Sequence, residues 1–207
     1  MKLIGMIDSP YVRRVAISLA KLNLAFEHLP LSVFSNFDQI KAINPVVKVP
    51  TLVTDDGTAL MESCLILDYV ERLVAPANSL MPTDLKRYTQ AQKITGIALG
   101  VCEKAVQAVY EYKLRPVEKQ YQPWLDRVHT QLAAALAYLE QEAQNANPWL
   151  LGGECFQSDI TSAVAFRFAC AKLPDHVQAS AYPALAAFSA QAEATDSFKA
   201  FPFPDDQ

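Results

Sequence analysis

The first third of the chain alternates between two patterns of apolar residues. Short apolar runs, typical of buried strands, are separated by stretches in which apolar residues recur every three or four positions, as on the buried face of a helix. In chain order, the pattern predicts a strand at KLIGMI, a helix over Tyr11–Leu22, a strand at FEHLPL, a helix at FDQIKAI, strands at VPTLV and TALM, and a helix over Ser63–Val74.

The connections between these elements indicate how the strands pair. The turn TDDGT separates the last two strands, and a turn this short favours an antiparallel hairpin. The first two strands are joined through a helix, which is typical of a parallel crossover. The N-terminal part is therefore predicted to be an α/β domain with a small mixed sheet and the order βαβ-α-ββα.

The rest of the chain has a helical pattern throughout. The segment Ala75–Asp84 contains two prolines and no apolar periodicity, so we expect a linker there. Helices are predicted beyond it over Leu85–Tyr112, PWLDRVHTQLAAALAYLEQEAQ, Asp159–Lys172 and Tyr182–Ala194. This pattern predicts an all-α C-terminal domain.

Composition narrows the classes of partner and location. The chain has 207 residues, of which 51% are hydrophobic, and a net charge of −4. No basic stripe is present, which argues against nucleic acid or an anionic membrane as a partner. No apolar segment approaches the roughly 20 residues that span a bilayer. Asp8, Arg13 and Arg14 interrupt the N-terminal apolar run before a signal-peptide core could form. A cytoplasmic protein is expected.

The cysteines do not indicate a metal site or a disulfide framework. They show no CxxC spacing and do not cluster with the histidines His28, His129 and His176, which are scattered along the chain. We therefore expect no metal, and buried free thiols in a reducing compartment, at Cys64, Cys102, Cys155 and Cys170.

Ser9 lies where the first strand passes into the first helix. The order Ser9-Pro10 suits an N-cap followed by proline at the first helical position. A helix N-terminus also favours an anion, including a thiolate, to which a serine hydroxyl could donate a hydrogen bond. The residues alone leave both roles open, and the capping role is the commoner one.

Two further stretches permit a structural and a functional interpretation. In NPVVKVPTLV, Pro50 interrupts a strand pattern, which fits either a cis bond after Val49 or an edge-strand proline. In MESCLI, Ser63 could be the N-cap of a helix with Glu62 at its positive end. The oxygens of Glu62 and Ser63 could instead hold the amino and carboxylate groups of an amino-acid-like ligand.

Taken in order, four motifs of this chain resemble the glutathione transferase family: SPYVRRV, NPVVKVPTL, ESCLILDYVE and PWLLGGECFQSDIT. The resemblance spans nearly the whole chain and is greatest to bacterial enzymes of the serine type. It implies a thioredoxin-like glutathione-binding domain over residues 1–76, a linker over 77–84 and an all-helical domain over 85–207.

The resemblance also implies roles for individual residues. Ser9 would be both the helix cap and the hydrogen-bond donor to the glutathione sulfur. The backbone of Val49, before cis-Pro50, would pair with the cysteinyl part of glutathione as an added strand does. Glu62 and Ser63 would hold the γ-glutamyl end, and Asn36 and Lys48 lie where some classes contact the glycine end.

The implied activity is that of a detoxification-type transferase in which glutathione, a co-substrate and not a cofactor, attacks a small hydrophobic electrophile through its thiolate. The alternatives are a glutathione-dependent isomerase or dehalogenase on the same fold, and a non-catalytic binding or regulatory protein. A thiol-transfer or reductive role is disfavoured, because relatives with that role have cysteine at the position of Ser9. Most members are homodimers, so a homodimer is expected.

The chain departs from the family pattern at three places. Val47 stands where glycine is frequent, and Leu99-Gly100 replaces an Asp-Gly pair that reaches the partner subunit's glutathione. Phe156 occupies the hydroxyl position of a capping box, so only the aspartate half, Asp159, remains. Asp159 is therefore interpreted as a folding residue at a helix start.

Overall fold

The computed structural model describes residues 1–204, and their contacts divide the chain into two compact units. The N-terminal unit comprises residues 1–80 together with 195–204, and the C-terminal unit comprises residues 81–194. The division falls inside the predicted linker. The return of residues 195–204 to the first unit differs from the domain bounds that the resemblance implies, which assign 85–207 to the helical domain. Residues 205–207 lie outside the described part.

The N-terminal unit is built on a four-stranded mixed sheet with the order β2-β1-β3-β4. Its strands are β1 (Lys2–Ile4), β2 (Glu27–Leu29), β3 (Thr51–Val53) and β4 (Ala59–Met61). β1 pairs in parallel with β2 and antiparallel with β3, and β3 and β4 form the antiparallel hairpin. The mixed sheet predicted from the strand and turn pattern is confirmed.

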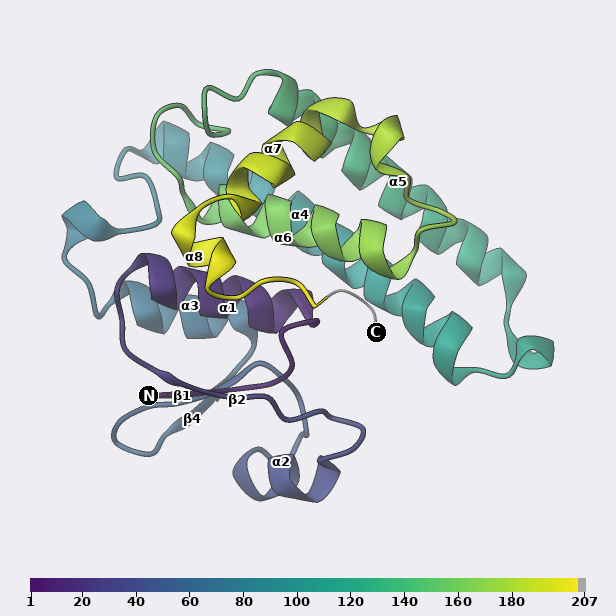
Figure 1. Ribbon diagram of the computed structural model, residues 1–207, viewed down its shortest axis with the longest axis horizontal. Helices are drawn as coiled ribbons and strands as arrows, with labels where there is room; N and C mark the ends of the chain where they lie inside the picture. The colour runs from purple at the N-terminus through teal and green to yellow at the C-terminus, as the bar shows by residue number, and fades with distance from the viewer. Residues whose placement is uncertain (205–207) are drawn as a thin grey trace. The chain divides into compact units, whose positions relative to one another are not determined.

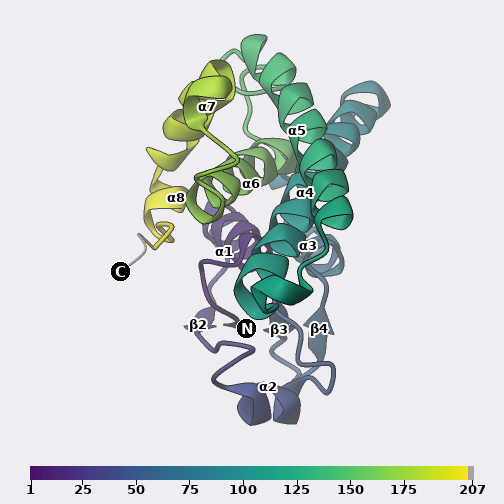
Figure 2. The same ribbon diagram turned by 90° about the vertical axis from the view of Figure 1, so that its right-hand side faces the viewer.

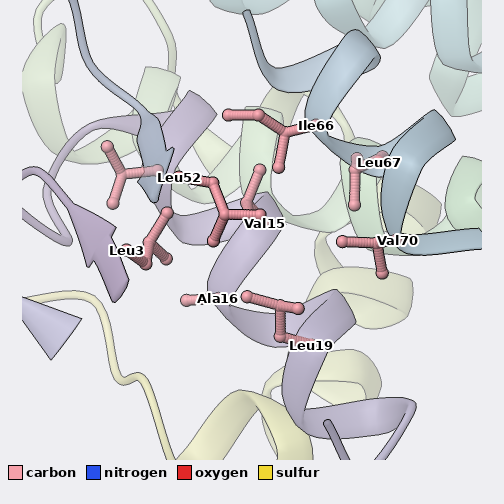
Figure 3. Packing of buried hydrophobic residues seen from close by; sticks show 9 residues of the cluster. Leu3, Val15, Ala16, Leu19, Leu52, Ile66, Leu67 and Val70 are labelled. Carbon is pink, nitrogen blue, oxygen red and sulfur yellow. The ribbon is translucent and has the colours of Figure 1, made fainter. Parts of the chain in front are cut away.

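Three helices cover this sheet: α1 (Pro10–Lys21), α2 (Phe37–Ile43) and α3 (Ser63–Glu71). α1 and α3 lie on one side of the sheet and α2 on the other (Figures 1 and 2). Between the sheet and the α1/α3 pair, Leu3 and Leu52 from paired strands meet Val15 of α1 and Ile66 of α3 (Figure 3). All four side chains are fully buried, so this layer fixes the two helices against the strands.

The C-terminal segment packs on α1 within the same unit. The short helix α8 (Asp196–Lys199) contacts α1, next to which it lies in Figure 1. The Nε atom of Arg13 donates to the carbonyl oxygen of Phe201 at 2.9 Å, and its guanidinium lies over the rings of Phe198 and Phe203, 5.6 and 5.8 Å from their centres. Residues 196–203 therefore form part of the N-terminal unit.

The C-terminal unit is helical. It consists of α4 (Leu85–Leu114), α5 (Gln122–Gln144), α6 (Gln157–Lys172) and α7 (Pro183–Glu193). Short 3₁₀ turns lie at Val117–Lys119 and Ala179–Ala181, and a third, Pro76–Asn78, precedes the unit. α6 is buried along most of its length and contacts α4 and α7. No helix within residues 1–204 is long and apolar enough to cross a membrane.

Asp159 organises the start of α6. Its carboxylate accepts hydrogen bonds from the backbone N–H groups of Phe156 at 2.8 Å and Leu150 at 2.7 Å. Because a phenylalanine side chain has no acceptor, only the aspartate half of a capping box is formed, as the sequence predicts. Burial raises the pKa of Asp159 to about 6, against the opposing effect of these hydrogen bonds.

All four cysteines are free thiols, as predicted, but the prediction that they are buried holds only for Cys102. Cys155 and Cys170 are partly buried, and Cys64 is exposed. The core-facing side of α3 is formed by Ser63, Ile66, Leu67 and Val70, and Cys64 lies off that face.

Candidate functional site

Ser9 caps α1. Its backbone is extended, and its Oγ atom accepts a long hydrogen bond, 3.4 Å, from the N–H of Val12, with Pro10 at the start of the helix. The capping role predicted from Ser9-Pro10 is confirmed. Capping uses an acceptor lone pair of the oxygen, whereas a thiolate would use the hydroxyl hydrogen, so the two roles are chemically compatible.

Gly5 brings the start of α1 and the segment around Val49 together. Its φ is +135°, and a Cβ at this position would lie 2.5 Å from Cγ2 of Val12 and 2.9 Å from Cβ of Val49. Only glycine permits this approach. The cap residue Ser9 therefore begins a helix whose first turn packs against the residue that precedes Pro50.

The Val49-Pro50 peptide bond is cis, as one of the two sequence interpretations predicts. The preceding loop is held by Asn44, which is buried. The Nδ2 atom of Asn44 donates to the carbonyl of Lys48 at 3.1 Å and to Oγ1 of Thr51 at 2.9 Å, and its Oδ1 accepts from the N–H of Val46 at 3.0 Å. Asn44 thus links the backbone before Val49 to the side chain of Thr51 after it, a role that the sequence analysis missed.

Val47 keeps a glycine-like backbone. It stands where the family often has glycine, and its φ is 53°, in the left-handed region. This conformation is unfavourable for a β-branched residue. Val47 therefore adds local backbone strain to this loop.

The start of α3 differs by one residue from the prediction. Glu62, and not Ser63, is the N-cap residue, with φ 76° and ψ 117°. Because Glu62 adopts this left-handed conformation, helical geometry begins at Ser63. The buried hydroxyl of Ser63 accepts a hydrogen bond from Nη1 of Arg14 at 3.0 Å and lies 3.4 Å from Oε1 of Glu62, to which it donates.

A cation from the loop lies beside this carboxylate. The Nζ atom of Lys48 is 3.1 Å from Oε2 of Glu62, and both side chains are about half exposed. Burial raises the pKa of Glu62, but the hydrogen bond and charge of Lys48, with the backbone N–H groups of Cys64 and Ser63, outweigh it and hold the pKa below its ordinary value. Glu62 is therefore anionic at neutral pH.

Asn36 is not brought to the other candidates by any hydrogen bond of its side chain. It precedes α2, and its amide bonds stay in its own segment, to Ser32 at 3.1 Å, to Ser35 at 3.3 Å and to Gln39 at 3.0 Å. The structure thus forms two groups from the candidates: Ser9 with the Val49 segment, and Lys48 with Glu62 and Ser63.

Arg14 was overlooked by the sequence analysis as a site residue. It is 1% exposed, although it carries a full charge. The sequence contains a signal for this burial: in VRRVAISLA, all residues except the two arginines and one serine are apolar. A helix of this composition is buried on most sides, and its arginines are buried with it.

Two of the supposedly scattered histidines meet in the C-terminal unit. The rings of His129 and His176 stack with centres 4.1 Å apart, and the hydroxyl of Tyr112 is 2.7 Å from Nε2 of His129. Burial, and then the charge of His176, lower the pKa of His129. Within residues 1–204, no three side chains of the His, Cys, Asp and Glu types come together to hold a metal ion.

Residues 3–78 match the family model described as the glutathione S-transferase N-terminal domain. A curated relative, the GST-like protein YibF of Escherichia coli K12, is 30% identical over 172 residues, which cover 83% of this chain and 80% of YibF.

Solved structures similar to the whole chain include two with bound ligands. A glutathione S-transferase of Methylobacterium radiotolerans in complex with glutathione sulfonate is 27% identical, with a TM-score of 0.91 and coverage of 100% of this chain and 95% of that one. A glutathione transferase family member of Pseudomonas fluorescens with bound glutathione is 28% identical, with a TM-score of 0.84 and coverage of 98% of both chains.

Proposed function

The chain belongs to the glutathione S-transferase family, and on that premise we propose that it binds reduced glutathione in its N-terminal unit and activates the thiol for attack on a small hydrophobic electrophile. The observation that carries this proposal is the packing of the Ser9-capped start of α1 against the segment of Val49 and cis-Pro50. The two similar structures that hold glutathione or its sulfonate support it.

In this proposal the thiol is activated by electrostatics. The start of α1 carries N–H groups without partners inside the helix and the positive end of its dipole. A thiolate placed there would receive a hydrogen bond from Ser9, so ionisation of the thiol would be favoured without a covalent step. The backbone of Val49 would pair with the cysteinyl residue of glutathione in the manner of an added strand.

The γ-glutamyl end would lie at the start of α3. Anionic Glu62 suits the ammonium group of that residue, and the hydroxyl of Ser63 suits its carboxylate. Lys48 already pairs with Glu62, and its exposed ammonium could meet the glycine carboxylate; Asn36 is proposed for the same end of the ligand.

We also propose a cytoplasmic homodimer. Cytoplasm supplies the reduced thiol that this chemistry needs. The N-terminal unit exposes large apolar side chains that an interface could cover, at Phe34, Phe37, Val46 and Leu65. Sedimentation at micromolar concentration should give twice the mass of the 22.9 kDa chain, and a monomer would contradict the dimer.

The role of Ser9 is tested by the pKa of the bound thiol, followed through thiolate absorbance against pH. Ser9→Ala and Ser9→Gly both remove the donor, and each should raise that pKa by about one to two units, the equivalent of one hydrogen bond to a charged group. Glycine is nearly as good an N-cap as serine, whereas alanine costs about 1 kcal/mol of stability. Equal pKa changes with unequal stabilities would therefore separate thiol activation from capping.

Ser9→Thr, which keeps the hydroxyl, should retain the low pKa. An unchanged thiol pKa in both Ser9→Ala and Ser9→Gly would contradict the proposal and leave Ser9 as a cap alone. Bound glutathione without turnover on any electrophile would favour the non-catalytic alternative. Turnover confined to isomerisation or dehalogenation would favour the other alternative.

A further inference from the structure

Arg14 is a buried cation placed directly behind the start of α3. It lies in α1, is 1% exposed, and its Nη1 atom donates to Oγ of Ser63 at 3.0 Å and to Sγ of Cys64 at 3.4 Å. Burying a guanidinium is costly unless its charge and donors are used. Here two of its contacts go to the first two residues of α3, which is where the proposed γ-glutamyl site lies.

The hydrogen bond from Arg14 determines which way the Ser63 hydroxyl can point. A guanidinium donates only, so Oγ of Ser63 acts as the acceptor and its single hydrogen must point away from Arg14. Its partner in the free protein is Oε1 of Glu62 at 3.4 Å, a long and therefore weak bond. An incoming carboxylate could take over this hydrogen at little cost.

The charge of Arg14 also acts on the same oxygen. A hydroxyl that accepts a hydrogen bond from a cation becomes a stronger donor, because consecutive hydrogen bonds in a buried network polarise one another. Glu62, on the outer side of Ser63, provides the opposite charge. The start of α3 therefore provides the carboxylate of Glu62 for an ammonium group. It also provides the hydroxyl of Ser63, which is polarised by Arg14, for a carboxylate.

We propose that Arg14 is a positioning residue that orients and polarises Ser63 toward the α-carboxylate of the γ-glutamyl residue. Arg14 thereby sets the preference of this site for a ligand that carries that carboxylate. This inference rests on the proposed function, because it concerns the same glutathione site.

The test compares two ligands and two matched variants. The ligands are glutathione and γ-aminobutyryl-cysteinyl-glycine, which lacks only the glutamyl α-carboxylate. Arg14→Met removes the guanidinium behind Ser63. Arg13→Met is the control, because Arg13 is an equally buried arginine of the same helix that contacts the carbonyl of Phe201 and the rings of Phe198 and Phe203.

In the wild-type protein, calorimetry should show at least tenfold tighter binding of glutathione than of the analogue. Arg14→Met should bind glutathione about tenfold more weakly and the analogue as well as wild type does, so that the preference disappears. Arg13→Met should lower the melting temperature and keep the preference. Ser63→Ala should lose the preference on its own, with no further loss when Arg14→Met is added.

The outcomes separate this inference from the proposed function. If wild type binds neither ligand, the proposed function fails. If wild type prefers glutathione and Arg14→Met keeps the wild-type preference, the role of Arg14 is overturned. Should Arg14→Met not fold, Arg14→Gln, which lacks the charge and is too short to place a donor where Nη1 of Arg14 lies, is scored by the same ratio, and a full wild-type preference in that variant overturns the proposal equally.

Discussion

Replacing Asn44 by alanine should loosen the loop that presents Val49. The side chain of Asn44 is 4% exposed and makes hydrogen bonds to Lys48, Thr51 and Val46 at 3.1, 2.9 and 3.0 Å. Alanine removes all of them at once. The carbonyl of Lys48 keeps a second donor, Oγ1 of Thr51 at 2.7 Å, but the N–H of Val46 loses the bond from this side chain.

The size of the effect follows from these bonds. Each neutral hydrogen bond contributes about 0.5–1.5 kcal/mol net, so losing these three bonds in Asn44→Ala should reduce the free energy of unfolding by about 1.5–4.5 kcal/mol. It should also weaken glutathione binding, because the Val49 backbone is then less well ordered. Urea unfolding should be followed by circular dichroism, since both tryptophans, Trp124 and Trp149, lie in the C-terminal unit and fluorescence would report on the other part of the chain.

Asn145→Ala is the matched control. Asn145 also donates an amide hydrogen bond to a backbone carbonyl, that of Gln141 at 3.0 Å, but on an exposed helix end. Its replacement should change stability by less than about 0.5 kcal/mol and leave glutathione binding unaltered. A loss below 1 kcal/mol in Asn44→Ala, with unchanged glutathione affinity, would refute the view that Asn44 holds the loop.

Two further changes test individual residues. Val47→Gly should raise the free energy of unfolding by about 1 kcal/mol, because glycine relieves the left-handed φ of 53°, and urea unfolding would show this; a loss of stability would contradict the strain. Asp159→Asn should lower stability at every pH, since it disrupts the hydrogen bonds from Phe156 and Leu150. Burial raises the pKa of Asp159 from 3.8 to about 6, so the stability that its protonated form provides is complete below pH 4 and is lost as the pH rises through 6. The stability difference between wild type and Asp159→Asn, measured by urea unfolding, should therefore shrink between pH 4 and 6.5 by at most about 3 kcal/mol, and a difference that grows over this range would contradict the assignment.

The elements of the fold were predictable because their signals are local. FDQIKAI matches α2 from end to end, and the turn TDDGT identified the β3–β4 hairpin. Such segments are predicted by the spacing of apolar residues and by turn residues, which are features only a few positions apart. The cis bond before Pro50 was one of two open interpretations, and the order of the motifs favoured it.

Contacts between distant residues were the part that sequence alone missed. Arg14 and Ser63 are separated by 49 positions, and Arg13 and Phe201 by 188. No local pattern encodes such pairs, since they arise only when helices pack. The prediction that Ser63 is the N-cap of α3 was wrong by one position for a different reason. Glu62 has a positive φ and is itself the N-cap, and the general preference for serine at N-caps does not predict this conformation.

The most direct test of the account is a calorimetric titration of the unmodified protein with reduced glutathione. We expect saturable binding of one glutathione per chain with a Kd between about 1 µM and 1 mM, equivalent to about 4–8 kcal/mol. Absence of binding at several times the upper limit of that range would contradict the central claim that the N-terminal unit is a glutathione site.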